Sequence, residues 1–163
     1  MIENKIDQFN LVLRDESYDL ISKDEWQPLA EQYIKNLVES LKLEKLFGKL
    51  SDSDSFRPAG YDVVYNFNKF PPHAIGYSLK QPQKGVLVST NAHFWNIWQE
   101  RYFEEYGKRL ELYTLYKMVQ HPKLYTTHFS RVDLVVDFID EGIDVGALYR
   151  SLVNGRSDVY YEE

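Results

Sequence analysis

Residues 61–90, YDVVYNFNKFPPHAIGYSLKQPQKGVLVST, decide the fold class of this 163-residue chain. At the start of the stretch, aromatic and β-branched side chains alternate with polar ones, which is the two-residue period of a strand. Three apolar runs, separated by two prolines and by a Gln-Pro-Gln-Lys-Gly turn, occupy residues 61–67, 74–79 and 86–90. Short turns join antiparallel neighbours, so the stretch predicts a three-stranded antiparallel meander.

A helix is predicted on the N-terminal side of the meander. Ser22 and Glu25 match a capping box, in which each side chain satisfies a free backbone N–H of the first turn. The apolar residues that follow recur at spacings of three and four, as in an amphipathic helix: Trp26, Leu29, Tyr33, Leu37 and Leu41. Gly48 is a suitable stop, and the polar residues 51–55 predict a loop. Residues 1–21 alternate only weakly, which predicts a short strand or a loose arm.

The C-terminal side of the meander predicts further helices and one more strand. Asn91 can cap a helix that runs in two pieces to residue 119. Residues 129–138 are rich in β-branched side chains and predict a fourth strand, and Asp144 can cap a last helix over residues 145–153. We therefore predict an α+β fold with a mainly antiparallel sheet, the three-stranded meander plus a later strand, and helices packed on one face.

Length and composition predict one compact domain in a globular protein. Hydrophobic residues make up 44% of the chain and charged residues 27%. We expect residues 1–55 to form an N-terminal arm and the amphipathic helix, and residues 56–163 to form the α+β region. No apolar run approaches the roughly 20 residues of a membrane span, and the chain has no cysteine. No apolar h-region follows the first five residues, so we expect no signal peptide. The expected location is the cytoplasm, with no membrane partner.

The net charge of −6 is unevenly distributed along the chain. Residues 1–55 and 132–163 carry net charges of −5 and −6, whereas residues 56–131 carry 10 basic and 5 acidic side chains, a net charge of +5. Binding of nucleic acid requires a local positive potential and not a basic total. The central segment can supply such a potential, and ordinary variation of surface charge is an equally good explanation.

Residues 130–138, SRVDLVVDF, carry the strongest chemical signal. In a regular strand Arg131, Asp133 and Asp137 share one face. The opposite face, which we expect to pack against the helices, holds Val132, Leu134, Val136 and Phe138. Arg131 lies about 6.6 Å along the strand from Asp133, within reach of an ion pair, whereas the two aspartates are about 13 Å apart, too far to ligate one ion. A metal site would take at most one aspartate. The alternative is a structural Arg131–Asp133 pair, with Asp137 capping a loop.

Two other residue types give weaker signals. The histidines show no metal-ligand spacing and are expected to be satisfied or exposed: His73, His93, His121 and His128. Tyr61, Tyr65 and Tyr77 would stack on the bases of a single strand if their face of the sheet were open, and the alternative is core packing. The chain has no phosphate-binding glycine loop and no nucleophile elbow.

The acidic strand resembles a motif of the replication initiation factor family. In residues 130–138 an arginine–hydrophobic–aspartate sequence is followed four residues later by a second aspartate, as in that family. The family comprises rolling-circle plasmid replication initiators and the related relaxases of integrative conjugative elements. The meander and the following helix agree with its pattern, so the resemblance covers residues 56–155. Phe138 is a departure, because the family often has a second acidic residue there.

The resemblance implies a DNA-nicking chemistry. A tyrosine attacks a phosphodiester, and a divalent cation, Mg²⁺ or Mn²⁺, polarises the scissile phosphate. Asp133 or Asp137 would supply part of the metal shell, and Arg131 would orient an acid or contact phosphate. The family's nucleophile lies in a basic Arg–hydrophobic–Tyr segment that ends in lysine, whereas Tyr160 and Tyr161 have acidic neighbours. No catalytic residue is therefore assigned in this chain, which we expect to be truncated at its C-terminus relative to that family.

The sequence-based prediction is thus the N-terminal portion of a rolling-circle replication initiator or relaxase. Its expected partner is origin DNA, single-stranded or in a hairpin. One alternative is a non-catalytic DNA-binding or interaction module derived from the same fold. Another is an unrelated metal-dependent nuclease, which would need a further acidic or histidine cluster. The sequence does not fix the oligomeric state, of which a dimer is one alternative.

Overall fold

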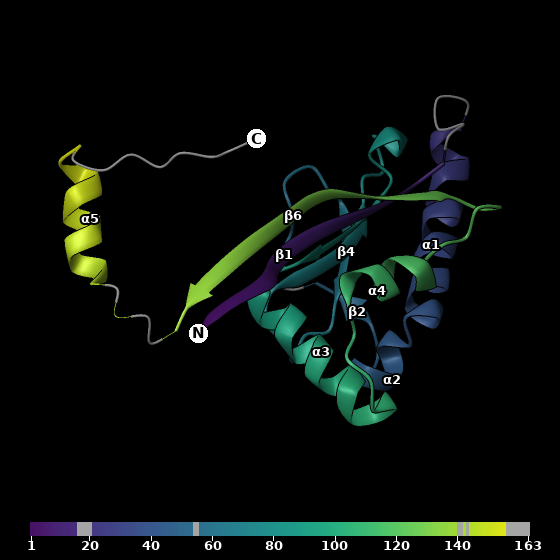
Figure 1. Ribbon diagram of the computed structural model, residues 1–163. Helices are drawn as coiled ribbons and strands as arrows, with labels where there is room; N and C mark the ends of the chain where they lie inside the picture. The colour runs from purple at the N-terminus through teal and green to yellow at the C-terminus, as the bar shows by residue number, and fades with distance from the viewer. Residues whose placement is uncertain (16–20, 54–55, 140–141, 143, 156–163) are drawn as a thin grey trace. The chain divides into compact units, whose positions relative to one another are not determined.

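The computed structural model describes most of the chain in two separate units (Figure 1). The described residues are 1–15, 21–53, 56–139, 142 and 144–155. The larger unit is Ile6–Asp133, and the smaller unit combines Met1–Lys5 with Leu134–Glu163. The division falls within the first and last strands of the sheet. Tyr160 and Tyr161 lie outside the described residues.

Six strands form one antiparallel sheet in the order β2-β3-β4-β5-β1-β6 (Figure 1). They are β1 (Ile2–Arg14), β2 (Ser51–Asp52), β3 (Val63–Asn66), β4 (His73–Tyr77), β5 (Val86–Thr90) and β6 (Thr126–Phe138). The predicted meander is β3-β4-β5, in which Tyr77 pairs with both Val63 and Val86. Gly76 is required inside it, because a Cβ atom there would collide with the backbone carbonyl oxygen of Val63. The predicted α+β class is confirmed.

The N-terminal strand is longer and more central than the sequence predicts. β1 spans 13 residues and lies between β5 and β6. Its pairing with β5 sets Leu11 opposite Val88. Phe9, Leu11 and Leu13 alternate along β1 and are fully buried. The predicted loop at residues 51–55 contributes the short β2, which pairs with β3.

The first predicted helix is divided into α1 (Lys23–Ser40) and α2 (Leu43–Phe47). The capping box is formed, because Ser22 Oγ accepts from the Glu25 backbone N–H at 3.3 Å and Glu25 Oε2 accepts from the Ser22 backbone N–H at 3.1 Å. Lys42 separates the two helices with a left-handed backbone at φ 56°. Gly48 follows α2 as its C-cap, also at positive φ.

The later helices begin at the predicted caps. The side chain of Asn91 accepts from the Phe94 backbone N–H at the start of α3 (Ala92–Tyr106), and α4 (Leu112–Met118) follows. In the smaller unit, Asp144 caps α5 (Val145–Val153). Within the described residues, no helix combines the length and apolar character needed to cross a membrane.

One hydrophobic core joins helices α1–α4 to one face of the sheet. All three tryptophans belong to it: Trp26, Trp95 and Trp98 are 0%, 2% and 1% exposed. The Trp26 indole N–H donates to the Ser78 carbonyl at 2.8 Å, so its polar atom is satisfied. Truncation of such a side chain to alanine costs about 3–5 kcal/mol, so these residues fix how the helices sit on the sheet.

The beginning of β6 packs on this core. Thr127 is 8% exposed, and the ring of Phe129 meets that of Phe9 edge-on with centroids 5.7 Å apart. Two-residue alternation from Phe129 places Arg131 and Asp133 in line with these core-facing residues.

The predicted orientation of β6 is therefore wrong. The side chains expected to pack against the helices are exposed: Val132 by 40%, Leu134 by 77% and Val136 by 49%. Apolar alternation identifies one face of a strand, but it does not say whether a helix covers that face.

Candidate nucleic-acid interface

Arg131 and Asp133 form a bidentate ion pair on β6. Arg131 Nε donates to Asp133 Oδ1 at 2.8 Å and to Oδ2 at 3.1 Å, and Nη2 donates to Oδ2 at 2.6 Å. The guanidinium holds the pKa of the Asp133 carboxyl below its usual range. Both side chains contact water, with 53% and 33% exposed. The i+2 spacing predicted this contact, and it occupies both oxygens of Asp133.

Asp137 is paired with a residue that the sequence did not indicate. Its Oδ2 lies 2.5 Å from Lys5 Nζ, within the smaller unit. In the same unit the N-terminal amino group donates to the Ile139 carbonyl at 2.6 Å. Lys5 and Asp137 come from opposite ends of the chain, so no local sequence pattern could have predicted their contact.

These residues do not fit a divalent metal site. Mg²⁺ and Mn²⁺ bind several oxygen or nitrogen ligands around one point. Within the described residues, no three His, Asp or Glu side chains come together in a group that could hold a metal ion. Each of the two aspartates that the resemblance marks is already neutralised by a cation, Arg131 or Lys5. We therefore derive no chemical step through a metal for this chain.

Two of the three tyrosines considered for base stacking, Tyr65 and Tyr77, belong to a hydrogen-bonded cluster. The hydroxyls of Tyr65 and Tyr77 both donate to Glu31 Oε1 at 2.7 Å, and Tyr77 is fully buried. Burial and the Glu31 carboxylate raise the pKa of both tyrosines. Burial also raises the pKa of Tyr61, over whose ring Lys84 Nζ lies 5.3 Å from the centroid. The core-packing alternative is therefore correct for Tyr77, and these tyrosines do not form an open stacking face.

His73 is a structural residue of the core. Its ring stacks on Phe94 with centroids 3.8 Å apart. Its Nε2 accepts from the Phe67 backbone N–H at 3.0 Å, and its Nδ1 lies 2.8 Å from the Pro71 carbonyl, to which it donates in the neutral form. Burial lowers the pKa of this imidazole. His73 is thus satisfied, as expected, and the other three histidines are exposed.

A pocket at the β2–β3 end of the sheet carries the clearest anion-binding chemistry. It has a volume of about 360 Å³ and is lined by Phe47, Gly48, Lys49, Ser51, Phe67, Asn68 and Lys69. No carboxylate lines it, and within the described part of the chain neither Lys49 nor Lys69 forms an ion pair. Asn68 Nδ2 donates to Ser51 Oγ at 2.9 Å, which joins the two loops beneath the lysines. We call this the lysine pocket.

A second pocket, formed by residues between 31 and 65, is negatively charged. It is lined by Glu31, Ile34, Lys35, Val38, Glu39, Glu44, Leu50 and Tyr65, with three carboxylates and one ammonium group. The two pockets show that the structure separates positive and negative groups although the net charge of the chain is −6. A phosphate would be attracted to the lysine pocket and repelled by the acidic one.

Comparisons with known proteins relate the chain to one solved structure. No protein-family model and no curated protein matches its sequence. The fold is similar to that of a rolling circle replication initiator protein from Geobacillus stearothermophilus, with a TM-score of 0.60 over 95% of this chain. The identity is 14%, so the likeness concerns the fold. The chain spans about half the length of that protein, of which the match covers 51%.

Proposed function

We propose that this chain is a DNA-binding part of a replication initiator of the rolling-circle type. The observation that carries the proposal is the likeness of its fold to a solved initiator over nearly the whole chain. A fold by itself hosts unrelated functions, so the proposal also needs support from a site. The lysine pocket gives that support, because its chemistry suits a phosphate of a DNA backbone.

The lysine pocket supports this proposal although the chain is acidic as a whole. Lys49 and Lys69 present two ammonium groups that no neighbouring carboxylate of the described residues neutralises. Each phosphate contact by a lysine releases condensed counterions, which makes binding favourable at low salt. The rings of Phe47 and Phe67, which also line the pocket, are buried and give it an apolar wall.

For the complete protein we propose, in addition, origin recognition and nicking of one strand through a tyrosine. The described residues of this chain favour the binding role over the catalytic one. Asp133 and Asp137 are ion-paired, and Tyr65 and Tyr77 are committed to Glu31. A cytoplasmic location is consistent with this proposal, and a dimer is one form in which two half-sites could be bound.

DNA binding can be measured by fluorescence anisotropy with a labelled 30-nucleotide single strand, a hairpin and a duplex. We expect the double variant Lys49→Gln/Lys69→Gln to weaken binding about 10-fold near 0.1 M salt. It should also reduce the slope of log K against log salt by about 1.4 for single strands, because two phosphate contacts are lost and each contributes about 0.7 to that slope.

Lys35→Gln is the control, because Lys35 lines the acidic pocket and the change removes one ammonium group, as each single change in the double variant does. Its effect should be less than about 2-fold, because its charge is compensated by nearby carboxylates. Wild-type protein that binds none of the three DNA forms at low salt would overturn the proposal. Equal losses of DNA affinity in the control and the double variant would show that the lysine pocket is not part of the DNA-binding site.

A further inference from the structure

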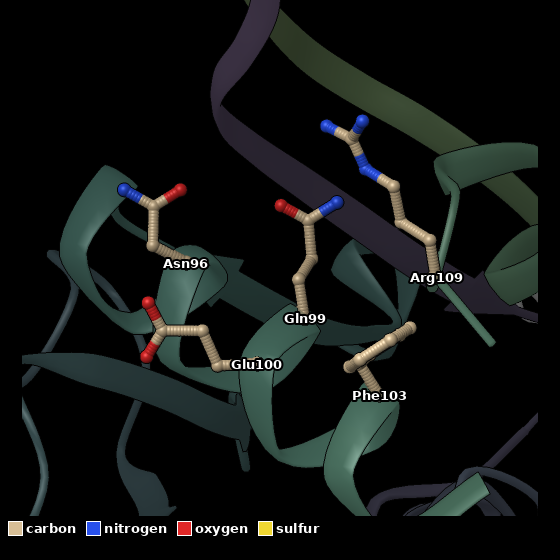
Figure 2. Close-up of a pocket in the computed structure, with 5 residues that line it drawn as sticks. All are labelled: Asn96, Gln99, Glu100, Phe103 and Arg109. Carbon is tan, nitrogen blue, oxygen red and sulfur yellow. The ribbon is translucent and has the colours of Figure 1, made fainter. Parts of the chain in front are cut away.

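A third pocket, in which one positive and one negative side chain balance, lies on one face of α3 (Figure 2). It has a volume of about 440 Å³ and is lined by Asn96, Gln99, Glu100, Phe103 and Arg109. The first four recur at helical spacing over two turns of α3, about 10 Å along its axis. Arg109 follows the end of this helix, where Gly107 turns the chain with a left-handed backbone. A volume of this size is within the range of pockets that hold small planar ligands.

The polar groups of the pocket have unused hydrogen-bonding capacity. Gln99 Nε2 donates to the Leu110 carbonyl at 2.8 Å, which fixes the amide and leaves its Oε1 as an acceptor. Figure 2 shows this amide between the side chains of Asn96 and Arg109. Within the described part of the chain, neither Glu100 nor Arg109 forms an ion pair. The pocket therefore offers a carboxylate, a guanidinium and oriented amides to a ligand.

Phe103 supplies an apolar surface beside these groups. Its side chain is 58% exposed, whereas Phe94, earlier on the same helix, is 2% exposed. An exposed aromatic ring is a suitable platform for another flat ring. A ligand that matches the whole pocket is thus planar, aromatic and edged with both donors and acceptors.

The charge of the pocket distinguishes a base from a phosphate. Glu100 and Arg109 carry opposite charges, so the pocket has no net attraction for an anion, in contrast to the lysine pocket. Guanine suits the pair best among the bases. Its O6 and N7 accept from a guanidinium, and its N2 amino group donates to a carboxylate.

We propose that this pocket binds an unpaired guanine of single-stranded DNA, stacked on Phe103 and held between Arg109 and Glu100. The proposal rests on the proposed DNA-binding function and names the base that accompanies the phosphates. A single strand is required, because stacking on Phe103 needs a base whose face is free.

The first test is anisotropy with labelled 12-nucleotide thymidine strands that contain one central dG, dA, dC or dT. Wild-type protein should prefer the dG strand over the all-dT strand by about 10-fold, as one good base contact provides. Phe103→Ala should weaken binding of the dG strand about 10-fold. Arg109→Gln and Glu100→Gln should each abolish most of the preference for dG.

The controls remove an aromatic ring, a positive charge and a carboxylate from positions that do not line the pocket. They are Tyr113→Ala, with a ring that is 67% exposed, Lys108→Gln and Glu104→Gln. Lys108→Gln should weaken all four strands equally and leave the preference for dG unchanged. If wild-type protein binds the four strands equally and Phe103→Ala changes nothing, DNA binding stands and the base pocket is overturned.

The second test uses free nucleotides and does not depend on DNA binding. We expect guanosine monophosphate, but not adenosine monophosphate, to shift the NMR signals of the Gln99 side-chain amide. Wild-type protein that binds no strand but shows this shift would overturn the proposed function and retain the pocket. Absence of the shift up to millimolar nucleotide, with no preference for dG among the strands, would overturn the pocket.

Discussion

β4 and the outer part of β6 belong to one sheet, and both carry polar side chains, but their surroundings are opposite. All five residues of β4 are buried, including His73 and Tyr77. From residue 130 to residue 137 the side chains of β6 contact water, and Leu134 is 77% exposed. The polar groups of β4 are bonded to the backbone or to α1, whereas Arg131 bonds to a carboxylate of its own strand.

This difference teaches that a conspicuous sequence motif and a strong structural constraint need not coincide. The charged residues of β6 are easier to recognise in the sequence than the polar residues of β4, but a solvated ion pair contributes little to stability. The polar groups of β4 are inconspicuous in sequence, but a buried group without its partner is costly. Four substitution experiments compare the two strands, and a fifth experiment asks whether the chain reacts with DNA.

The largest contrast is expected between Ile75→Ala in β4 and Leu134→Ala in β6. Ile75 is 2% exposed, so its truncation leaves a cavity and should lower the free energy of unfolding by about 2–5 kcal/mol. Leu134 is mostly in water, and its truncation should change the free energy by less than about 0.5 kcal/mol. Urea denaturation followed by circular dichroism measures both. Equal losses would mean that an unseen partner covers β6.

The next contrast is the pH dependence that His73 gives to β4. Its folded pKa is lowered from 6.5 by burial, so below pH 6.5 the unfolded chain binds the proton more readily than the folded one. The contribution of neutral, buried His73 to the free energy of unfolding is therefore complete above pH 6.5. It is lost as the pH falls through the lowered folded pKa, by up to about 1.4 kcal/mol per pH unit. Chemical denaturation between pH 7.5 and 5 should show this slope. It should flatten in His73→Gln and persist in His93→Gln, whose ring is exposed.

A smaller effect is expected from Tyr77→Phe. This change removes one of the two hydroxyls that donate to Glu31 Oε1 and keeps the buried ring. The free energy of unfolding should fall by about 1 kcal/mol, because Tyr65 still donates to the carboxylate. The double variant Tyr65→Phe/Tyr77→Phe should lose more than the sum of the single changes, since Glu31 then lacks both donors. Strict additivity would show that Glu31 is satisfied by water.

In β6, Arg131→Gln and Asp133→Asn should leave stability unchanged within the error of a urea titration. Both side chains are solvated, and each can exchange its partner for water. The same measurement on Asp137→Asn should also show no change, since its pair with Lys5 is exposed as well. A clear loss of stability in any of the three variants would mean that the substituted residue is more buried, or more strongly paired, than the structure shows.

The last prediction is the absence of a reaction. This chain should form no covalent adduct with single-stranded DNA in the presence of Mg²⁺ or Mn²⁺, because its described residues include no group of His, Asp and Glu side chains that could hold a metal ion, and the hydroxyls of Tyr65 and Tyr77 donate to Glu31. Denaturing electrophoresis of a labelled strand is the measurement. An adduct that disappears in Tyr160→Phe or Tyr161→Phe would restore the catalytic role.

The elements that the sequence predicts well depend on local chemistry. The Ser22–Glu25 capping box, the Asn91 cap and the alternation in residues 61–67 each act within a few residues, so they can be read without knowing the fold. The Arg131–Asp133 pair is local in the same sense.

What the sequence could not predict depends on contacts between distant segments. The first residues of β1 are largely polar, and their pairing within the sheet determines that they form a strand. Lys49 and Lys69 meet in one pocket because β2 and β3 are neighbours. Which face of β6 meets the core depends on contacts such as that of Phe129 with Phe9, which the alternation within β6 does not encode.

The position of β1 has a consequence for synthesis on the ribosome. β1 is the first strand to emerge, yet its neighbours in the sheet, β5 and β6, are translated much later. Until Thr126–Phe138 has left the exit tunnel, one long edge of β1 lacks its partner. Such late pairing slows folding and leaves an unpaired, aggregation-prone strand edge exposed until it is complete. Nascent chains released before residue 126 should therefore depend on chaperones and aggregate without them.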